Sequence, residues 1–181
     1  MRDHAVIGRV DQVCFLVDDI DRGMATYSQL FGATQWRIYR YGPDTIPALG
    51  YRGEPGRFSF WVALSDCDPQ IELIESIEGP SIYTEWIEQR GLGFHHIGHF
   101  TTSLDADAAA LEQHGMAISQ WGRGYGLDGD GAFTYLDSLD QLGVVVELIE
   151  IPKRRRSPDR QWTVPPEHGE KPGRARSAGA A

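Results

Sequence analysis

The sequence predicts an α+β fold in which two tandem βαβββ modules form one curved mixed sheet. The stretch QIELIE at residues 70–75 returns as VVELIE at 145–150, and in both stretches branched apolar residues alternate with acids at the period of a β-strand. Sliding one half of the chain over the other also aligns residues 11–21 with residues 95–105. Curved sheets that repeat in this way bury their concave faces by pairing, so we expect the two modules to share one site.

The first module follows the order strand, helix, strand, strand, strand. Its strands are rich in β-branched and aromatic residues, and Gln12, Cys14 and Leu16 share one face of the first strand. We expect strands within residues 9–19, 34–41, 57–64 and 70–75, and a helix that Asp19 or Asp21 caps and Gly32 ends.

The second module repeats this order. Ser103 begins its helix, and Leu104, Ala108 and Leu111 form the apolar stripe. We expect strands at 94–102, 116–122, 131–137 and 144–150, with a helix at 81–91 that connects the modules. The chain is therefore divided into a first module at 1–79, a connecting helix at 80–93, a second module at 94–151 and a C-terminal extension at 152–181.

Charge and composition limit the kinds of partner that the protein is expected to bind. The net charge is −9, with +5 on residues 152–181 and −14 on the rest, and so acidic a body is a poor nucleic-acid surface. The extension is interpreted as flexible or draped over the surface, with its basic run at 153–156 solvated and Trp162 docked on the body or on a neighbouring subunit. No apolar run approaches the ~18 residues of a membrane span, and the two cysteines make no disulfide framework, so a cytoplasmic protein is expected.

Strand parity assigns the repeated acids to opposite faces. In each copy only one acid can point into the concave face, and the superposition selects Glu72 and Glu147 and leaves Glu75 and Glu150 to solvent. A buried carboxylate is costly unless it is neutralised, paired or bound to a metal.

The same superposition sets Gln12 opposite His96, while parity places His95 and His99 on the far face. Gln12, Glu72, His96 and Glu147 therefore form a predicted metal cage. Imidazole, carboxylate and amide donors suit one divalent ion per site, such as Zn, Ni, Co, Mn or Fe.

These residues resemble the vicinal oxygen chelate superfamily over about residues 7–151. The ligand set Gln, Glu, His, Glu and the segment GFHHIG resemble glyoxalase I, and the connecting helix followed by GFHHI resembles methylmalonyl-CoA epimerase. The resemblance implies a metal-dependent isomerase, epimerase or lyase that transfers a proton next to a carbonyl. It implies that Glu147 acts as the base and that Glu72 returns the proton.

Parity also predicts the substrate pocket. Its wall should be mostly apolar, which favours an apolar carbonyl compound or acyl thioester over a small dicarboxylate. Arg123 and Tyr125 lie in the glycine-rich stretch at 121–131 and are further candidate contacts. The predicted substrate-binding residues are Cys14, Gln70, Ile74, Phe94, Gly98, Val145, Arg123 and Tyr125.

Two alternatives stay open at this point. A metal-free binding protein of the bleomycin-resistance type would use aromatics such as Trp36, Phe60 and Trp121 to sequester a ligand. A ring-cleaving extradiol-type dioxygenase would bind Fe(II) through two histidines and one carboxylate, whereas Gln12 stands at the first histidine position. The resemblance also implies a small-molecule substrate and a homodimer, and it leaves open whether the ligands come from one chain or two.

Overall fold

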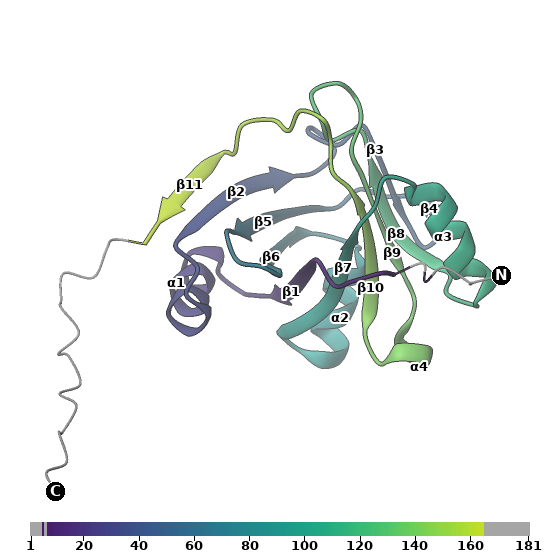
Figure 1. Cartoon of the computed structure of the whole chain (residues 1–181), viewed down its shortest axis with the longest axis horizontal. Helices are drawn as coiled ribbons and strands as arrows, with labels where there is room; N and C mark the ends of the chain where they lie inside the picture. The colour runs from purple at the N-terminus through teal and green to yellow at the C-terminus, as the bar shows by residue number, and fades with distance from the viewer. Residues whose placement is uncertain (1–4, 6, 165–181) are drawn as a thin grey trace, which may run out of the picture.

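Residue 5 and residues 7–164 are described by the computed structural model, which is dominated by one strongly curled sheet (Figure 1). The elements of the first half are β1 (Gln12–Leu16), α1 (Ile20–Phe31), β2 (Gln35–Tyr41), β3 (Ala48–Tyr51), β4 (Glu54–Pro55), β5 (Ser59–Ser65) and β6 (Gln70–Glu78). The elements that follow are α2 (Ile82–Arg90), β7 (Gly93–Phe100), α3 (Leu104–Gln113), β8 (Ile118–Arg123), β9 (Ala132–Leu136), α4 (Leu139–Leu142), β10 (Val145–Glu150) and β11 (Arg160–Thr163).

The sheet confirms the predicted repeat. Its strand order is β11-β2-β5-β6-β1-β7-β10-β9-β8-β3-β4. The first module contributes β2-β5-β6-β1. The second contributes the corresponding strands in the reverse order across the sheet, β7-β10-β9-β8. The first strands of the two modules, β1 and β7, pair antiparallel at the centre. The predicted α+β fold is therefore correct, and the modules pair within one chain.

Each edge of the sheet is completed by a strand from the other half of the chain. The insertion between β2 and β5 supplies β3, which pairs with β8 of the second module. The C-terminal segment supplies β11, which pairs with β2 of the first module. In β11, Trp162 lies opposite Trp36 and packs against the apolar cluster that α1 forms with the sheet. Residues 152–164 therefore lie on the surface of the body, which is one of the two arrangements expected for the extension. Residues 165–181 of the predicted extension lie outside the described residues.

The helices α1 and α3 cover the outside of the curl, whereas α2 packs against the inner face beside a cavity that stays open. α1 begins at Asp19, whose side chain accepts a hydrogen bond from the Arg22 amide, and it ends at Gly32 with a positive φ of 77°. Its buried positions include Ile20 and Met24, whereas Leu30 and Phe31 in its last turn are 70% and 56% exposed.

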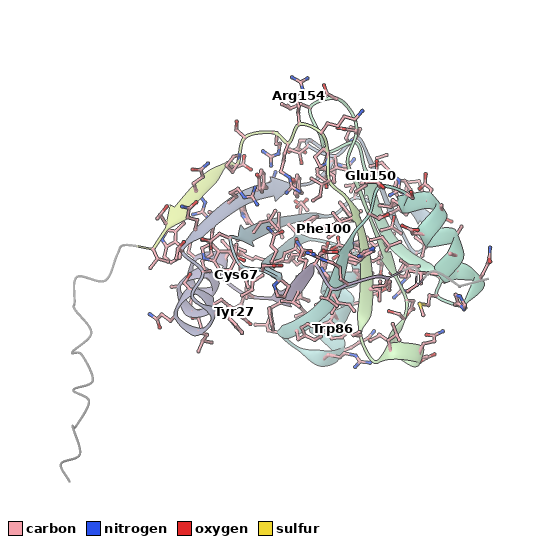
Figure 2. All side chains as sticks on the ribbon, in the orientation of Figure 1. Tyr27, Cys67, Trp86, Phe100, Glu150 and Arg154 are labelled. Atoms are coloured by element: carbon pink, nitrogen blue, oxygen red, sulfur yellow. The ribbon has the colours of Figure 1, made fainter. Side chains whose placement is uncertain are left out.

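Three apolar clusters follow from this arrangement. α1 packs on the first module and α3 on the second, while the third cluster lines the inner face. Figure 2 shows Tyr27 and Cys67 on the α1 side of the sheet and Trp86 on α2, below the centre. The inner cluster is unusually aromatic, with Tyr39, Tyr41, Phe58, Phe60, Tyr83, Tyr125, Phe133 and Tyr135 among its members.

Asp11, next to Gln12, links the first strands of the two modules through its carboxylate. Its carboxylate accepts hydrogen bonds from the Phe100 amide and from His99, both at 2.9 Å, and it pairs with Arg9. Burial raises the pKa of Asp11, but these hydrogen bonds and the charge of Arg9 outweigh it and lower the pKa below its ordinary value of 3.8.

We expect Asp11→Asn to lower the free energy of unfolding by about 1–2 kcal/mol at pH 7, because hydrogen bonds to a charged acceptor are lost. The folded-state pKa lies below the unfolded one, so the stabilisation is present above about pH 4 and is lost as the pH falls through the folded pKa. Denaturant titrations at pH 7 and pH 3 test this, with the exposed Asp140→Asn as control. A difference from the wild type that stays equal at both pH values would contradict the assignment.

Candidate metal centre and substrate cavity

The four predicted ligands come from the four central strands of the sheet. Glu72 lies on β6, Gln12 on β1, His96 on β7 and Glu147 on β10, and these strands are consecutive neighbours. The register places Cys14 between Glu72 and His96, and Gly98 between Gln12 and Glu147. All four side chains are buried and reach the concave side, so one chain supplies the whole set.

A carboxylate oxygen lies on each side of the His96 imidazole. His96 Nε2 lies 3.1 Å from Glu72 Oε2 and 3.0 Å from Glu147 Oε2. These three atoms and Gln12 Oε1 are buried, and none of the four makes a well-aligned hydrogen bond to another described residue. Four buried polar atoms without hydrogen-bond partners are costly for a fold. Ligand atoms of Cys14, Glu72 and His96 lie within 4.8 Å of one another, and Glu147 also approaches His96, so these residues fit a divalent cation.

The electrostatics of the cluster are strongly perturbed. Burial lowers the pKa of His96, but the adjacent Glu147 and Glu72 carboxylates outweigh it and raise that pKa to about 9. Burial raises the pKa of Glu147, and although His96 opposes this effect the net direction is upward. Burial, followed by the two carboxylates, also raises the pKa of the Cys14 thiol well above its usual range. The cluster therefore binds protons readily, and a metal would compete with them.

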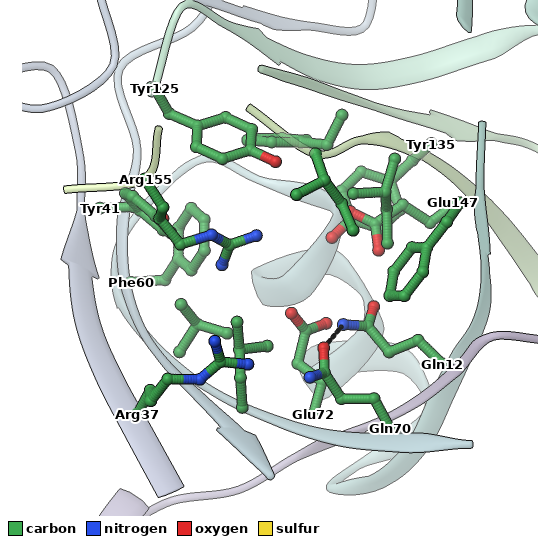
Figure 3. A pocket seen from close by; sticks show the side chains of 16 residues that line it. Gln12, Arg37, Tyr41, Phe60, Gln70, Glu72, Tyr125, Tyr135, Glu147 and Arg155 are labelled. Atoms are coloured by element: carbon green, nitrogen blue, oxygen red, sulfur yellow. Dashed lines mark hydrogen bonds between the residues drawn. The ribbon is translucent and has the colours of Figure 1, made fainter. Parts of the chain in front are cut away.

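Neighbouring side chains hold the ligands in place. Gln12 Nε2 donates to Gln70 Oε1 at 3.0 Å, which fixes the orientation of the Gln12 amide (Figure 3). A Cβ on Gly98 would lie 2.9 Å from Gln12 Oε1, so the absence of a side chain there leaves room for Gln12. Tyr135 lies opposite Glu147 in the β9–β10 pair, and its hydroxyl accepts a 2.9 Å hydrogen bond from Tyr83.

His95 lies beside the ligands, contrary to the parity prediction that placed it on the far face. The β1–β7 register shifts after Cys14, which pairs with His96, so that Phe15 pairs with Phe94 and His95 has no partner in the ladder. His95 is fully buried, with its Nδ1 2.8 Å from Nδ1 of His96. Burial lowers the pKa of His95 well below the usual range, so the neutral ring can accept a hydrogen bond from His96 and orient it.

A cavity of about 290 Å³ opens beside the cluster on the concave face. Figure 3 shows Gln12, Glu72 and Glu147 on one side of this cavity and the guanidinium groups of Arg37 and Arg155 on the other. The wall between them is aromatic and aliphatic and includes Tyr41, Phe60, Val62, Leu64, Phe100, Tyr125, Phe133, Tyr135, Ile149 and Ile151.

The predicted substrate contacts divide into three groups. Gln70 and Tyr125 line the cavity, and Gly98 lies against Gln12 at its edge. Cys14, Ile74 and Val145 are buried in the inner cluster and do not line the cavity.

Two predicted contacts are wrong. Phe94 is 45% exposed and packs edge-on against Phe15, because the register shift turns it to the outer face. Arg123 pairs with Asp105 at 3.0 Å and donates to Thr134 at 2.9 Å, which holds it near α3 and away from the cavity.

Two charged cavity residues, Arg37 and Arg155, were not predicted, and they make the wall less apolar than expected. Strand periodicity puts Arg37 on the same face of β2 as Tyr39 and Tyr41, so the sequence pattern could have placed it on the concave face. Arg155 belongs to the basic run that was interpreted as solvated. Its place depends on where the C-terminal segment crosses the sheet, for which the sequence has no local signal.

Comparison with known proteins agrees with this architecture. A hypothetical protein from Bacillus halodurans C-125 superposes with a TM-score of 0.59 at 18% identity, covering 82% of this chain and 98% of its own. Methylmalonyl-CoA epimerase from Mycobacterium tuberculosis superposes with a TM-score of 0.58 at 20% identity, over 84% and 95% of the two chains. A point variant of the Streptomyces coelicolor methylmalonyl-CoA epimerase, in complex with 2-nitronate-propionyl-CoA, gives 0.58 at 19% identity, over 83% and 99%.

At these identities the likeness shows a shared fold. No curated protein matches the chain significantly in sequence. No helix among the described residues is both long and apolar enough to cross a membrane. The family model for the Glyoxalase/Bleomycin resistance protein/Dioxygenase superfamily matches residues 11–135, and the chain belongs to that superfamily.

Proposed function

We propose that the chain is a divalent-metal-dependent enzyme that transfers a proton at the carbon next to a carbonyl, as an isomerase, epimerase or lyase. The observation that carries this proposal is a set of four buried polar atoms on four neighbouring strands, without hydrogen-bond partners among the described residues, beside a cavity of small-molecule size. Two of the four donors are carboxylates, one on each side of His96, and carboxylates can also move protons.

Gln12, Glu72, His96 and Glu147 would hold the metal. When bound there, a divalent ion supplies Lewis-acid chemistry, which polarises a carbonyl and increases the acidity of the adjacent C–H. The donors suit Zn, Ni, Co, Mn or Fe(II). Gln12 contributes a neutral amide oxygen, so the two carboxylates balance the charge of a divalent ion without excess negative charge.

The two carboxylates divide the proton transfer between them. Glu147 Oε2 takes the proton from the carbon, and Tyr135 flanks Glu147 from the neighbouring strand β9. Glu72 lies on the other side of His96 and returns the proton from the opposite direction, which would invert the carbon in an epimerase. The aromatic wall excludes water from the reacting atoms.

The substrate is a carbonyl compound whose reacting end is small. A cavity of about 290 Å³ admits an acyl group or a compact small molecule, and a longer carrier such as a thioester would extend out of the mouth. One of the structural neighbours is a methylmalonyl-CoA epimerase in complex with methylmalonyl-CoA, which supports acyl thioesters as the first class to test.

Hydrogen exchange in D₂O tests this proposal without requiring the final product. Protein loaded in turn with Zn, Ni, Co, Mn or Fe(II) is incubated with short acyl thioesters and 2-oxo compounds, and deuterium at the α-carbon is measured by mass spectrometry. We expect deuterium uptake that requires both protein and metal. Absence of uptake over the whole set, together with tight binding of unreactive aromatic ligands by the metal-free protein, would favour a sequestering protein instead.

A further inference from the structure

We infer that Arg37 and Arg155 form an anion clamp that selects substrates carrying a carboxylate in addition to the reacting carbonyl. The inference rests on the proposed function and deepens it, because it specifies the substrate class. The clamp consists of two guanidinium groups from opposite ends of the chain that point into the same cavity, across from the acidic ligands (Figure 3).

Arg37 is placed by the register of the first module. It lies opposite Leu64 on β5, and Leu64 lies opposite Glu72 on β6, so Arg37 and Glu72 occupy one row across the concave face. Two strand spacings separate their backbones by roughly 10 Å. No carboxylate among the described residues pairs with Arg37, and its side chain accordingly has all its donors free for a ligand.

Arg155 is held over the cavity by the segment that leads to β11. An antiparallel bridge joins it to Gly126, and its guanidinium carbon lies 5.5 Å from the ring centres of both Tyr39 and Tyr125. The flanking residues are fixed separately, because Arg154 pairs with Asp128 and Arg156 pairs with Asp159.

Arg155 therefore differs from both neighbours in having no carboxylate partner among the described residues. Arg155 is half-buried, and within the part of the chain that the structure describes its guanidinium contacts aromatic rings without using its N–H groups.

The charges of the cavity favour an anionic ligand. A divalent ion would neutralise Glu72 and Glu147, so the two arginines would leave a net positive cavity inside an otherwise acidic body. A carboxylate matches the planar fork of a guanidinium and forms short, charge-assisted hydrogen bonds with it. The cavity would thus orient a substrate by its two ends, with the carbonyl towards the ligands and the carboxylate towards the arginines.

A binding comparison that needs no turnover tests the clamp. Zn-loaded protein is titrated calorimetrically with dicarboxylates from malonate to adipate, with monocarboxylates of the same carbon number, and with inorganic phosphate. We expect the best dicarboxylate to bind at least about tenfold more tightly than its monocarboxylate counterpart, because only it reaches both sides of the cavity. Phosphate binding of equal strength would show that the arginines form a general anion site, which would overturn the selection of carboxylates.

Three variants test which arginines cause the preference for dicarboxylates. Arg37→Gln and Arg155→Gln are expected to weaken dicarboxylate binding about 10–100-fold and monocarboxylate binding much less. Arg154→Gln removes the same charge from the same segment but from outside the cavity, so its affinities should equal those of the wild type. Zn content and melting temperature, measured on each variant, verify that the fold and the metal site are intact.

Equal dicarboxylate affinity in all three variants and the wild type, or an equal loss in all three, would overturn the clamp. Partial rescue by Arg155→Lys, which keeps the charge but not the planar fork, would support it. These measurements are independent of catalysis. If the wild-type protein exchanges no α-hydrogen, the proposed function is wrong. The titrations would still show whether the two arginines bind a carboxylate.

Discussion

Glu147→Gln is expected to retain the divalent ion and to lose α-hydrogen exchange by about 10²–10⁴-fold, the usual contribution of a general base. The amide oxygen of glutamine can still ligate a cation, as Gln12 is expected to do, but an amide does not accept a proton at neutral pH. Metal content by elemental analysis and deuterium uptake by mass spectrometry separate the two effects. Full exchange activity in a metal-loaded Glu147→Gln protein would show that another group is the base.

Glu150→Gln is the matched control for this substitution. Glu150 lies on the same strand, three residues further along, and does not line the cavity. Removing its charge changes the net charge of the protein by the same amount. We therefore expect exchange and metal content at wild-type levels, and an equal loss in both variants would indicate a global effect of charge.

His96→Ala is expected to abolish tight metal binding. His96 contributes the imidazole at the centre of the set, with its Nε2 about equidistant from the two carboxylates. Without it, Glu72 and Glu147 face each other with no cationic or imidazole group between them. Metal content should fall from about one ion per chain to a trace.

The same variant should lose stabilisation by metal. At a free metal concentration of 100 Kd, binding stabilises the native state by about 2.7 kcal/mol, which raises the melting temperature of a chain of this size by roughly 5–10 °C. We expect this rise in the wild type and in His114→Ala, an exposed control at the end of α3, but not in His96→Ala. An undiminished rise in His96→Ala would place the metal elsewhere.

The sequence by itself determined the fold class and the four candidate ligands. The repeat of ELIE fixes two equivalent strands, and the period of two in a strand leaves only one acid of each pair able to face inward. The same local rules placed the ends of α1 at Asp19 and Gly32, because capping depends on residues within a single turn.

Only the tertiary structure decided what surrounds those ligands. Parity failed at His95 and Phe94, because one extra residue in β7 exchanges the faces of the strand beyond it, and no local signal in the sequence marks that shift. Arg155 reaches the cavity only because β11 pairs with β2, a contact between residues more than 120 positions apart. Local periodicity specifies which face a residue occupies within its own strand, whereas the partners across the cavity depend on how distant segments pack together.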